Sequence, residues 1–266
     1  MPAHPAFDAD RWSDAVAVRR SRRAYDAAAT DPEKLEVLAA TAATFMPFED
    51  VRAVVVHGIP ANLFSGIIGS YGKVTGATSA ILFICDTTSP NAEEHCGYTG
   101  EGVVLEATAL GLGTCWISGS FSRTVSAGLV ELKEGEIVRA ASPVGAATTG
   151  LSGTERLLYG QARPKFRRPL DVIAPGHETW PAWAGEGARA ARVAPSAINR
   201  QPWRFRYENG SVVVSATGSA PGTGRLDCGI AMLHFELGAR SEGSDGAWVA
   251  AAAPDVARWE SFSQAL

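Results

Sequence analysis

Cysteine is scarce in this sequence of 266 residues, which contains only Cys85, Cys96, Cys115 and Cys228. No two of them form a Cys-x-x-Cys pair, and four cysteines are too few for a secreted domain whose fold depends on disulfides. We therefore expect a protein of a reducing compartment, the cytoplasm.

Long apolar runs and an excess of basic charge are missing as well. No stretch approaches the ~18 apolar residues of a membrane-spanning helix. The first residues, MPAHPAFDADRW, include acidic side chains and no apolar segment, so they resemble neither a signal peptide nor a transit peptide. The 24 basic and 28 acidic side chains give a formal charge of -4, so neither nucleic acid nor a membrane is expected as a partner.

Several short motifs of known chemistry are absent. The sequence contains no Walker phosphate loop and no Gly-x-Ser-x-Gly nucleophile motif, so hydrolytic chemistry lacks support. The pair Gly111 and Gly113 follows a predicted helix, whereas the glycines of a dinucleotide-binding turn precede one. His95 beside Cys96 is the only position in the sequence where a histidine and a cysteine are adjacent, and we do not expect this pair to bind a metal.

Helical and strand patterns alternate along the chain, which predicts an α/β or an α+β protein. Apolar residues recur at helical spacing around 12–18, 35–42 and 102–112. Thr30 with Glu33 predicts a capping box at the start of the second of these helices. Three apolar runs rich in β-branched or small residues predict strands, at 51–57, 79–85 and 136–144.

The second half contains the clearest turn signal. Asn209-Gly210 separates two strand-like runs, and both central positions of a type I′ hairpin turn require a positive φ. A β-hairpin is therefore expected over 203–215. His234 lies on the apolar stripe of a later predicted helix, which is typical of a core histidine.

The string from Arg19 to Arg23 is the most basic segment near the N-terminus. It follows a predicted helix, and it is compatible with a solvated helix end, a nucleic-acid contact or an anion-binding site. Ser21 favours the anion site, because a hydroxyl among guanidinium groups suits a phosphate. Lys165 and Arg167 would face the same way in an extended stretch and could add positive charge, although a solvated surface explains them equally well.

Three segments carry a resemblance to known proteins: Arg19-Arg20-Ser21-Arg22-Arg23, the stretch GLGTCWISG at 111–119 and the stretch APSAINRQPWRF at 194–205. Together they resemble the FMN-dependent nitroreductase family. In ordinary members the PSxxNxQPW loop follows the RRSxR helix closely within one subunit, whereas here it lies in the second half. The order resembles two fused subunits, as in tandem single-chain members of the family.

The resemblance implies the α+β class, an α/β sandwich with a nitroreductase-like fold. Two diverged halves, 8–160 and 170–266, would form an intramolecular pseudo-dimer within one interlocked unit, 1–266. Residues 40–48 resemble a worn copy of the segment 195–203 that has lost its Asn and Gln. Each half lacks what the other keeps, so one intact FMN site per chain is expected. A monomer is the expected state.

Family positions imply the roles of the residues around the phosphate. Arg19, Arg20 and Ser21 would hold the phosphate and ribityl chain of FMN. Lys165 and Arg167 would complete the positive charge around the phosphate.

The ring of the flavin would be contacted from both halves. Arg23 matches the position beside its pyrimidine edge, where a positive charge stabilises the reduced flavin. The Ser118 backbone N–H would donate to N5. The segment that passes N5 comprises Trp116, Ile117, Ser118 and Gly119. The second half would contribute Pro195, Ser196, Ala197, Asn199 and Gln201.

The activity implied is that of an oxidoreductase that takes hydride from NAD(P)H at N5 of FMN and reduces a nitroaromatic, a quinone or a similar small-molecule acceptor by ping-pong kinetics. The alternative is a flavin-binding or flavin-modifying protein without NAD(P)H reductase activity, because the family includes such diverged members.

Overall fold

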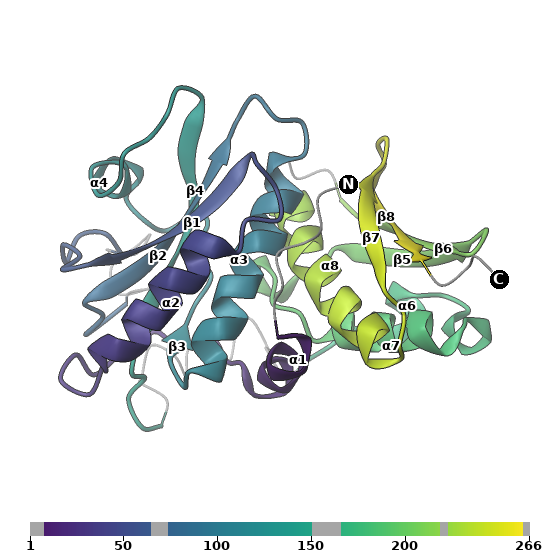
Figure 1. The fold of residues 1–266 in the computed structure, drawn as a ribbon, viewed down its shortest axis with the longest axis horizontal. Coiled ribbons are helices and arrows are strands. Elements are labelled where there is room, and N and C mark those ends of the chain that lie inside the picture. Colours follow the sequence, from purple (N-terminus) through teal and green to yellow (C-terminus); the bar gives the residue numbers. More distant parts are fainter. Residues whose placement is uncertain (1–7, 65–73, 151–165, 219–222, 263–266) are drawn as a thin grey trace.

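The computed structural model describes residues 8–64, 74–150, 166–218 and 223–262. These residues form two four-stranded antiparallel sheets, and two long helices, α3 (Ala92–Ala109) and α8 (Thr223–Ser241), lie between them (Figure 1). The predicted α+β class is thus confirmed. None of the described helices combines the length and the apolar character that crossing a membrane would require.

The two sheets repeat one topology. The first has the order β1-β2-β4-β3 and the second β5-β6-β8-β7, and in each the long helix connects the second strand to the third. A helix also precedes each sheet: α2 (Pro32–Thr44) and α7 (Ala182–Arg192). The strands are β1 (Val51–His57), β2 (Ser79–Asp86), β3 (Gly113–Thr114), β4 (Glu136–Gly145), β5 (Trp203–Glu208), β6 (Ser211–Ala216), β7 (Gly246–Ala250) and β8 (Asp255–Ser261). The chain therefore contains two structurally equivalent halves.

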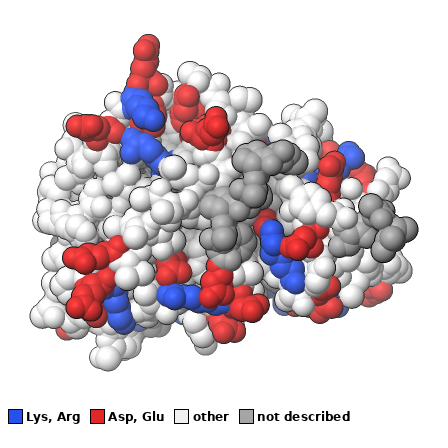
Figure 2. Space-filling model, in the orientation of Figure 1, with Lys and Arg blue, Asp and Glu red and all other residues white. Residues whose placement is uncertain are grey.

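Short helices complete the chain. They are α1 (Ala9–Val18), α4 (Arg123–Ala127), α6 (Leu170–Ile173) and the two single-turn helices η1 (His177–Thr179) and η2 (Ala197–Asn199). On the face seen in Figure 2, acidic and basic side chains are interspersed among a majority of other residues.

Local sequence signals explain most of these elements. The hairpin β5–β6 turns at Asn209 and Gly210, whose φ values of 50° and 80° confirm the predicted turn. The prediction that Thr30 caps α2 is wrong. Asp31 is the N-cap residue instead, and its side chain accepts from the Glu33 N–H at 2.9 Å. Thr30 instead donates to the Asp26 carbonyl at 3.0 Å, since the chain turns there before the helix begins.

The halves meet where α3 crosses α8 at two glycines. A Cβ atom on Gly229 would lie 1.9 Å from the Glu94 carbonyl oxygen, and one on Gly97 would lie 2.0 Å from that of Leu226. Only glycine permits this approach, because real Cβ atoms do not come so close to backbone atoms. Each helix thus places a glycine against the backbone of the other.

This contact predicts a large effect of a single methyl group. Gly229→Ala should lower the free energy of unfolding by more than ~2 kcal/mol, because the close-packed helices would have to separate. Urea denaturation followed by circular dichroism measures the change. Gly224→Ala is the matched control on α8, since its Cβ would lie 3.6 Å from Ala216; it should be neutral or slightly stabilising. Equal stability of both variants would contradict the crossing.

Candidate functional site

The basic string leaves α1 and runs beside β3. Ser21 pairs with Thr114 in a parallel bridge, and the Arg22 backbone N–H donates to the Thr114 carbonyl at 2.8 Å. Arg19 is 7% exposed, whereas Arg20 lies on the surface and bonds back to the Ala17 and Arg19 carbonyls. Ser21 and Arg23 are half-buried. The string and the segment 116–119 therefore lie next to each other.

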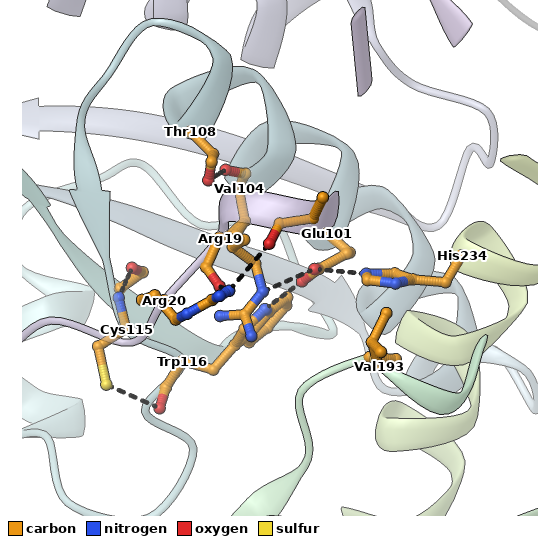
Figure 3. Close-up of polar contacts among 12 residues, drawn as sticks. Arg19, Arg20, Glu101, Val104, Thr108, Cys115, Trp116, Val193 and His234 are labelled. Carbon is orange, nitrogen blue, oxygen red and sulfur yellow. Dashed lines mark hydrogen bonds and ion pairs between the residues drawn. The ribbon is translucent and has the colours of Figure 1, made fainter. Parts of the chain in front are cut away.

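A fully buried carboxylate lies beneath these two segments. Glu101 on α3 accepts a hydrogen bond from Trp116 Nε1 at 2.7 Å and is joined to His234 Nε2 on α8 at 2.9 Å (Figure 3). Arg19 Nε is 3.8 Å from Glu101 Oε1, which is an ion pair without a hydrogen bond. The core position predicted for His234 is correct, since the ring is 0% exposed.

The guanidinium group of Arg19 is buried and lacks an acceptor. Its Nε has no hydrogen-bond partner, and no side-chain hydrogen bond joins Arg19 to any other part of the described chain. A buried cation whose N–H donors make no hydrogen bond favours an anionic ligand, because leaving such donors without an acceptor costs free energy.

Arg167 brings a second segment to the same place. Its guanidinium donates to the carbonyls of Val193 and Ala194 and, at 2.9 Å, to Asn199 Oδ1. Burial, with repulsion from Arg19, Arg192 and Arg20, lowers the pKa of Arg167 to about 10. The positive guanidinium groups of Arg19, Arg20 and Arg192 thus lie near that of Arg167, and such a cluster suits a phosphate.

The loop after α7 is held in a strained conformation. Ile198, Asn199 and Gln201 have φ values of 46°, 57° and 52°, in the left-handed region that side chains other than glycine seldom adopt. The Gln201 N–H donates to Ser196 Oγ at 2.9 Å, and Pro195 is buried. This loop opposes α8 and turns back to Arg167, so it belongs to the same site.

The side-chain amides within this loop have different tasks. Asn199 donates to the Phe166 carbonyl at 2.9 Å while accepting from Arg167, and it is half-buried. Gln201 is 1% exposed, and its oxygen accepts from the Arg168 N–H at 2.8 Å. Gln201 therefore fastens the loop to 166–168 from the inside.

Three further predicted site residues, Ile117, Ser118 and Gly119, follow one another after β3 and differ in burial. Ser118 is half-buried, and its N–H finds no acceptor within the residues described. Ile117 beside it is buried and pairs with Ala141 of β4, which fixes the strand-like path of this segment. Gly119 is exposed, and a Cβ there would meet nothing within 4 Å. The segment therefore presents an unused donor.

Trp116 points inward. Its indole stacks on Phe83 with ring centroids 4.3 Å apart and packs over Gly100, where a Cβ would lie 2.4 Å from the ring. The side chain thus fills space between β2 and α3. Lys165, the remaining predicted residue, lies outside the described residues.

The structure brings together groups that the sequence did not point to: Glu101, Arg192 and Asp227. Asp227 on α8 is 3% exposed and accepts from the Ala197 N–H at 3.1 Å, so it supports the strained loop. In the sequence, the sign that Glu101 and Asp227 have a special role is that each is an acidic residue on the apolar face of a predicted helix.

Burial makes the ionisation of Asp227 a determinant of stability. Desolvation raises its pKa from 3.8 to about 7, against the Ala197 hydrogen bond and the charges of Arg200 and Arg139, which lower it. The folded protein therefore keeps this proton over a pH range in which the unfolded chain has lost it.

The expected pH dependence follows from that raised pKa. The stability due to protonated Asp227 is full below pH ~4 and falls by up to ~4 kcal/mol as the pH rises towards 7. Asp227→Asn, which retains an acceptor for Ala197, should lack this component. Urea denaturation of both proteins between pH 5 and 8 measures it, and parallel curves would contradict the assignment.

Comparisons with known proteins show the fold and the family of this chain. A structure from Thermotoga maritima described as a "putative nitroreductase" is 19% identical, with 97% of each chain covered and a TM-score of 0.63, which shows the same fold. A nitroreductase from Bacteroides fragilis, solved with bound FMN, is 20% identical over 53% of this chain and 90% of its own, with a TM-score of 0.41. None of the curated proteins compared matches this chain. The family model described as "Putative TM nitroreductase" matches residues 12–239, and the chain belongs to that family.

Proposed function

We propose that this protein is an FMN-dependent oxidoreductase of the nitroreductase type that uses NAD(P)H. The observation that carries the proposal is the buried Arg19, whose Nε has no hydrogen-bond partner and which makes no side-chain hydrogen bond with the described chain. Arg167 lies close enough to Arg19 and Arg20 for their charges to lower its pKa. This donor set fits a phosphate, and family membership makes the phosphate that of FMN.

The phosphate end of the site would combine residues of the first half with residues of the segment between the halves. Arg19, Arg20 and Ser21 would bind the phosphate and the ribityl chain from the first half. Arg167 would approach from the other side, held by Val193, Ala194 and Asn199. Lys165 is assigned to the same cage by its family position.

The segment 116–119, which follows β3, would form the part of the site that holds the flavin ring. The Ser118 N–H would donate to N5, and Arg23 would place a positive charge beside the pyrimidine edge, which stabilises the reduced state. Trp116, Ile117 and Gly119 shape this wall. Across from it, Pro195, Ser196, Ala197 and Asn199 would contact the ring and ribityl chain, with Gln201 holding their loop.

When bound, FMN supplies a centre that accepts hydride from NAD(P)H and returns electrons to a nitroaromatic, quinone or similar acceptor. The protein's part is to bind the phosphate, to orient the ring and to hold a donor at N5. One pocket that serves both substrates implies ping-pong kinetics.

One FMN per chain is supported by the equivalent position of the other half. There the loop 45–50, which corresponds to 193–202, and β7, which corresponds to β3, enclose a pocket with space for about one water molecule. Phe48 and His95 stack at 3.7 Å in its wall, and Trp248 and Ala250 close it. In addition, α2 extends to Thr44, so residues 40–44, which the sequence comparison matched with 195–199, are helical, and the loop before β1 is shorter than the loop before β5.

The halves assigned here are 8–160 and 170–266, and they form a pseudo-dimer within one chain. A monomer in the cytoplasm is therefore proposed as the working form.

The spectrum of the purified protein tests the cofactor and the reductant together. A flavin spectrum at one FMN per chain, bleached without oxygen by NADPH or NADH, is expected. A flavin that neither nicotinamide reduces would favour a flavin-binding or flavin-modifying role without reductase activity. Colourless protein that cannot be reloaded with FMN would refute the proposal.

Substitutions test the site itself. Arg19→Ala combined with Arg20→Ala should weaken FMN binding by several kcal/mol, because charge-assisted contacts to phosphate contribute ~1.5–3 kcal/mol each. Asn199→Ala should also weaken it, because Arg167 loses its side-chain acceptor. Fluorescence titration with FMN measures both.

Arg206→Ala is the matched control for these arginine substitutions. Arg206 of β5 pairs with Glu208 and with Asp255 of β8 on the surface of the second sheet, and none of the three is assigned to the proposed site. Its removal should leave FMN affinity unchanged. Undiminished affinity in Asn199→Ala would argue against a site shared between the halves.

A further inference from the structure

Glu101 is a fully buried carboxylate beside the proposed site, and its polar partners come from distant parts of the chain. It lies in α3 at 0% exposure, and its carboxylate meets Trp116, His234 and Arg19 at 2.7, 2.9 and 3.8 Å (Figure 3). These partners come from three different segments: the stretch after β3, helix α8 and the stretch after α1. No step of the proposed reaction uses Glu101.

Two of its partners are parts of the proposed FMN site. Arg19 turns Nε towards Glu101, which leaves its two terminal nitrogens for a phosphate. Trp116 begins the segment whose Ser118 N–H would face N5, and its indole is fixed between Glu101 and Phe83. One carboxylate therefore contacts the elements that bind the phosphate and those that orient the ring.

The third partner ties this carboxylate to the opposite half. His234 is fully buried, and its Nδ1 has no hydrogen-bond partner among the described residues, so the ring directs its single hydrogen bond to Glu101. A buried carboxylate is tolerated only when donors surround it. Its position is consequently determined by both halves at once.

We propose that Glu101 is a positioning residue for FMN, which holds Arg19 in the orientation that binds phosphate and Trp116 in the orientation that presents the Ser118 N–H. His234 holds Glu101 in place from the second half. This inference rests on the proposed function and assigns to it a residue that touches neither the phosphate nor the ring.

The two tasks of Glu101 are separable by substitution. In Glu101→Gln the amide oxygen still accepts from Trp116, but the charge that orients Arg19 is lost. The Kd for FMN should rise about tenfold, while the Kd for riboflavin, which lacks the phosphate, should stay the same.

Trp116→Phe tests the other task while leaving the charge of Glu101 in place. It removes the indole N–H, so FMN and riboflavin should weaken together. The ¹⁵N resonance of flavin N5, recorded with labelled FMN, should shift in this variant because the donor at N5 moves. If Trp116 only stabilised the core, Trp116→Phe would leave the N5 resonance unchanged.

Glu106→Gln is a closely matched control. Glu106 lies on the same helix and likewise accepts from a tryptophan and an arginine, Trp12 at 2.9 Å and Arg11 at 2.8 Å. Neither belongs to the proposed site. This variant should keep wild-type Kd values for both flavins.

Three results would overturn the inference. An FMN Kd in Glu101→Gln within twofold of wild type, or tighter than wild type, would show that the carboxylate does not orient Arg19. Equal losses for FMN and riboflavin in both Glu101→Gln and Glu106→Gln would reveal general destabilisation. A wild-type protein that cannot bind FMN would refute the proposed function and this inference with it, whereas the first two results leave the proposed function standing.

Discussion

The backbone-to-backbone approach of α3 and α8 at Gly97 and Gly229 is the constraint on which the arrangement of the molecule depends. Because each helix connects the second and third strands of its own sheet, the crossing sets where the two sheets lie. It also brings Glu101 within reach of His234, although the two are 133 positions apart in the sequence. A wider crossing would separate these side chains and loosen the floor of the proposed site.

Polar pairs make this crossing specific. Tyr98 donates to Glu236 at 2.8 Å, and Glu94 pairs with Arg225, so carboxylates on both helices obtain donors from the opposite half. If one helix slid along the other by a turn, these carboxylates would be buried without donors, which would destabilise the fold. Apolar contacts can be exchanged for one another without this loss of free energy. The Tyr98–Glu236 hydrogen bond and the Glu94–Arg225 ion pair therefore select one register.

The sequence predicted the elements whose signals are local and missed the contacts made between distant segments. The turn at Asn209-Gly210 and the buried β2 follow from residue types alone, since backbone preference and apolar runs act over a few positions. The family resemblance assigned the basic string 19–23 and the loop 195–199 to one site. In the structure Arg167 lies near both, since it bonds to Asn199 and is repelled by Arg19 and Arg20. Glu101 was missed because its partners are spread over the whole chain, and a single acidic residue in an apolar helix does not say what it meets.

The two halves belong to one polypeptide, and this changes how the interface responds to dilution. Two separate subunits dissociate once their concentration falls below the dissociation constant, and a site shared between them is then lost. Covalent linkage instead keeps the halves at a fixed, high effective concentration. The crossing of α3 and α8 can therefore persist at nanomolar protein, and its integrity depends on folding alone.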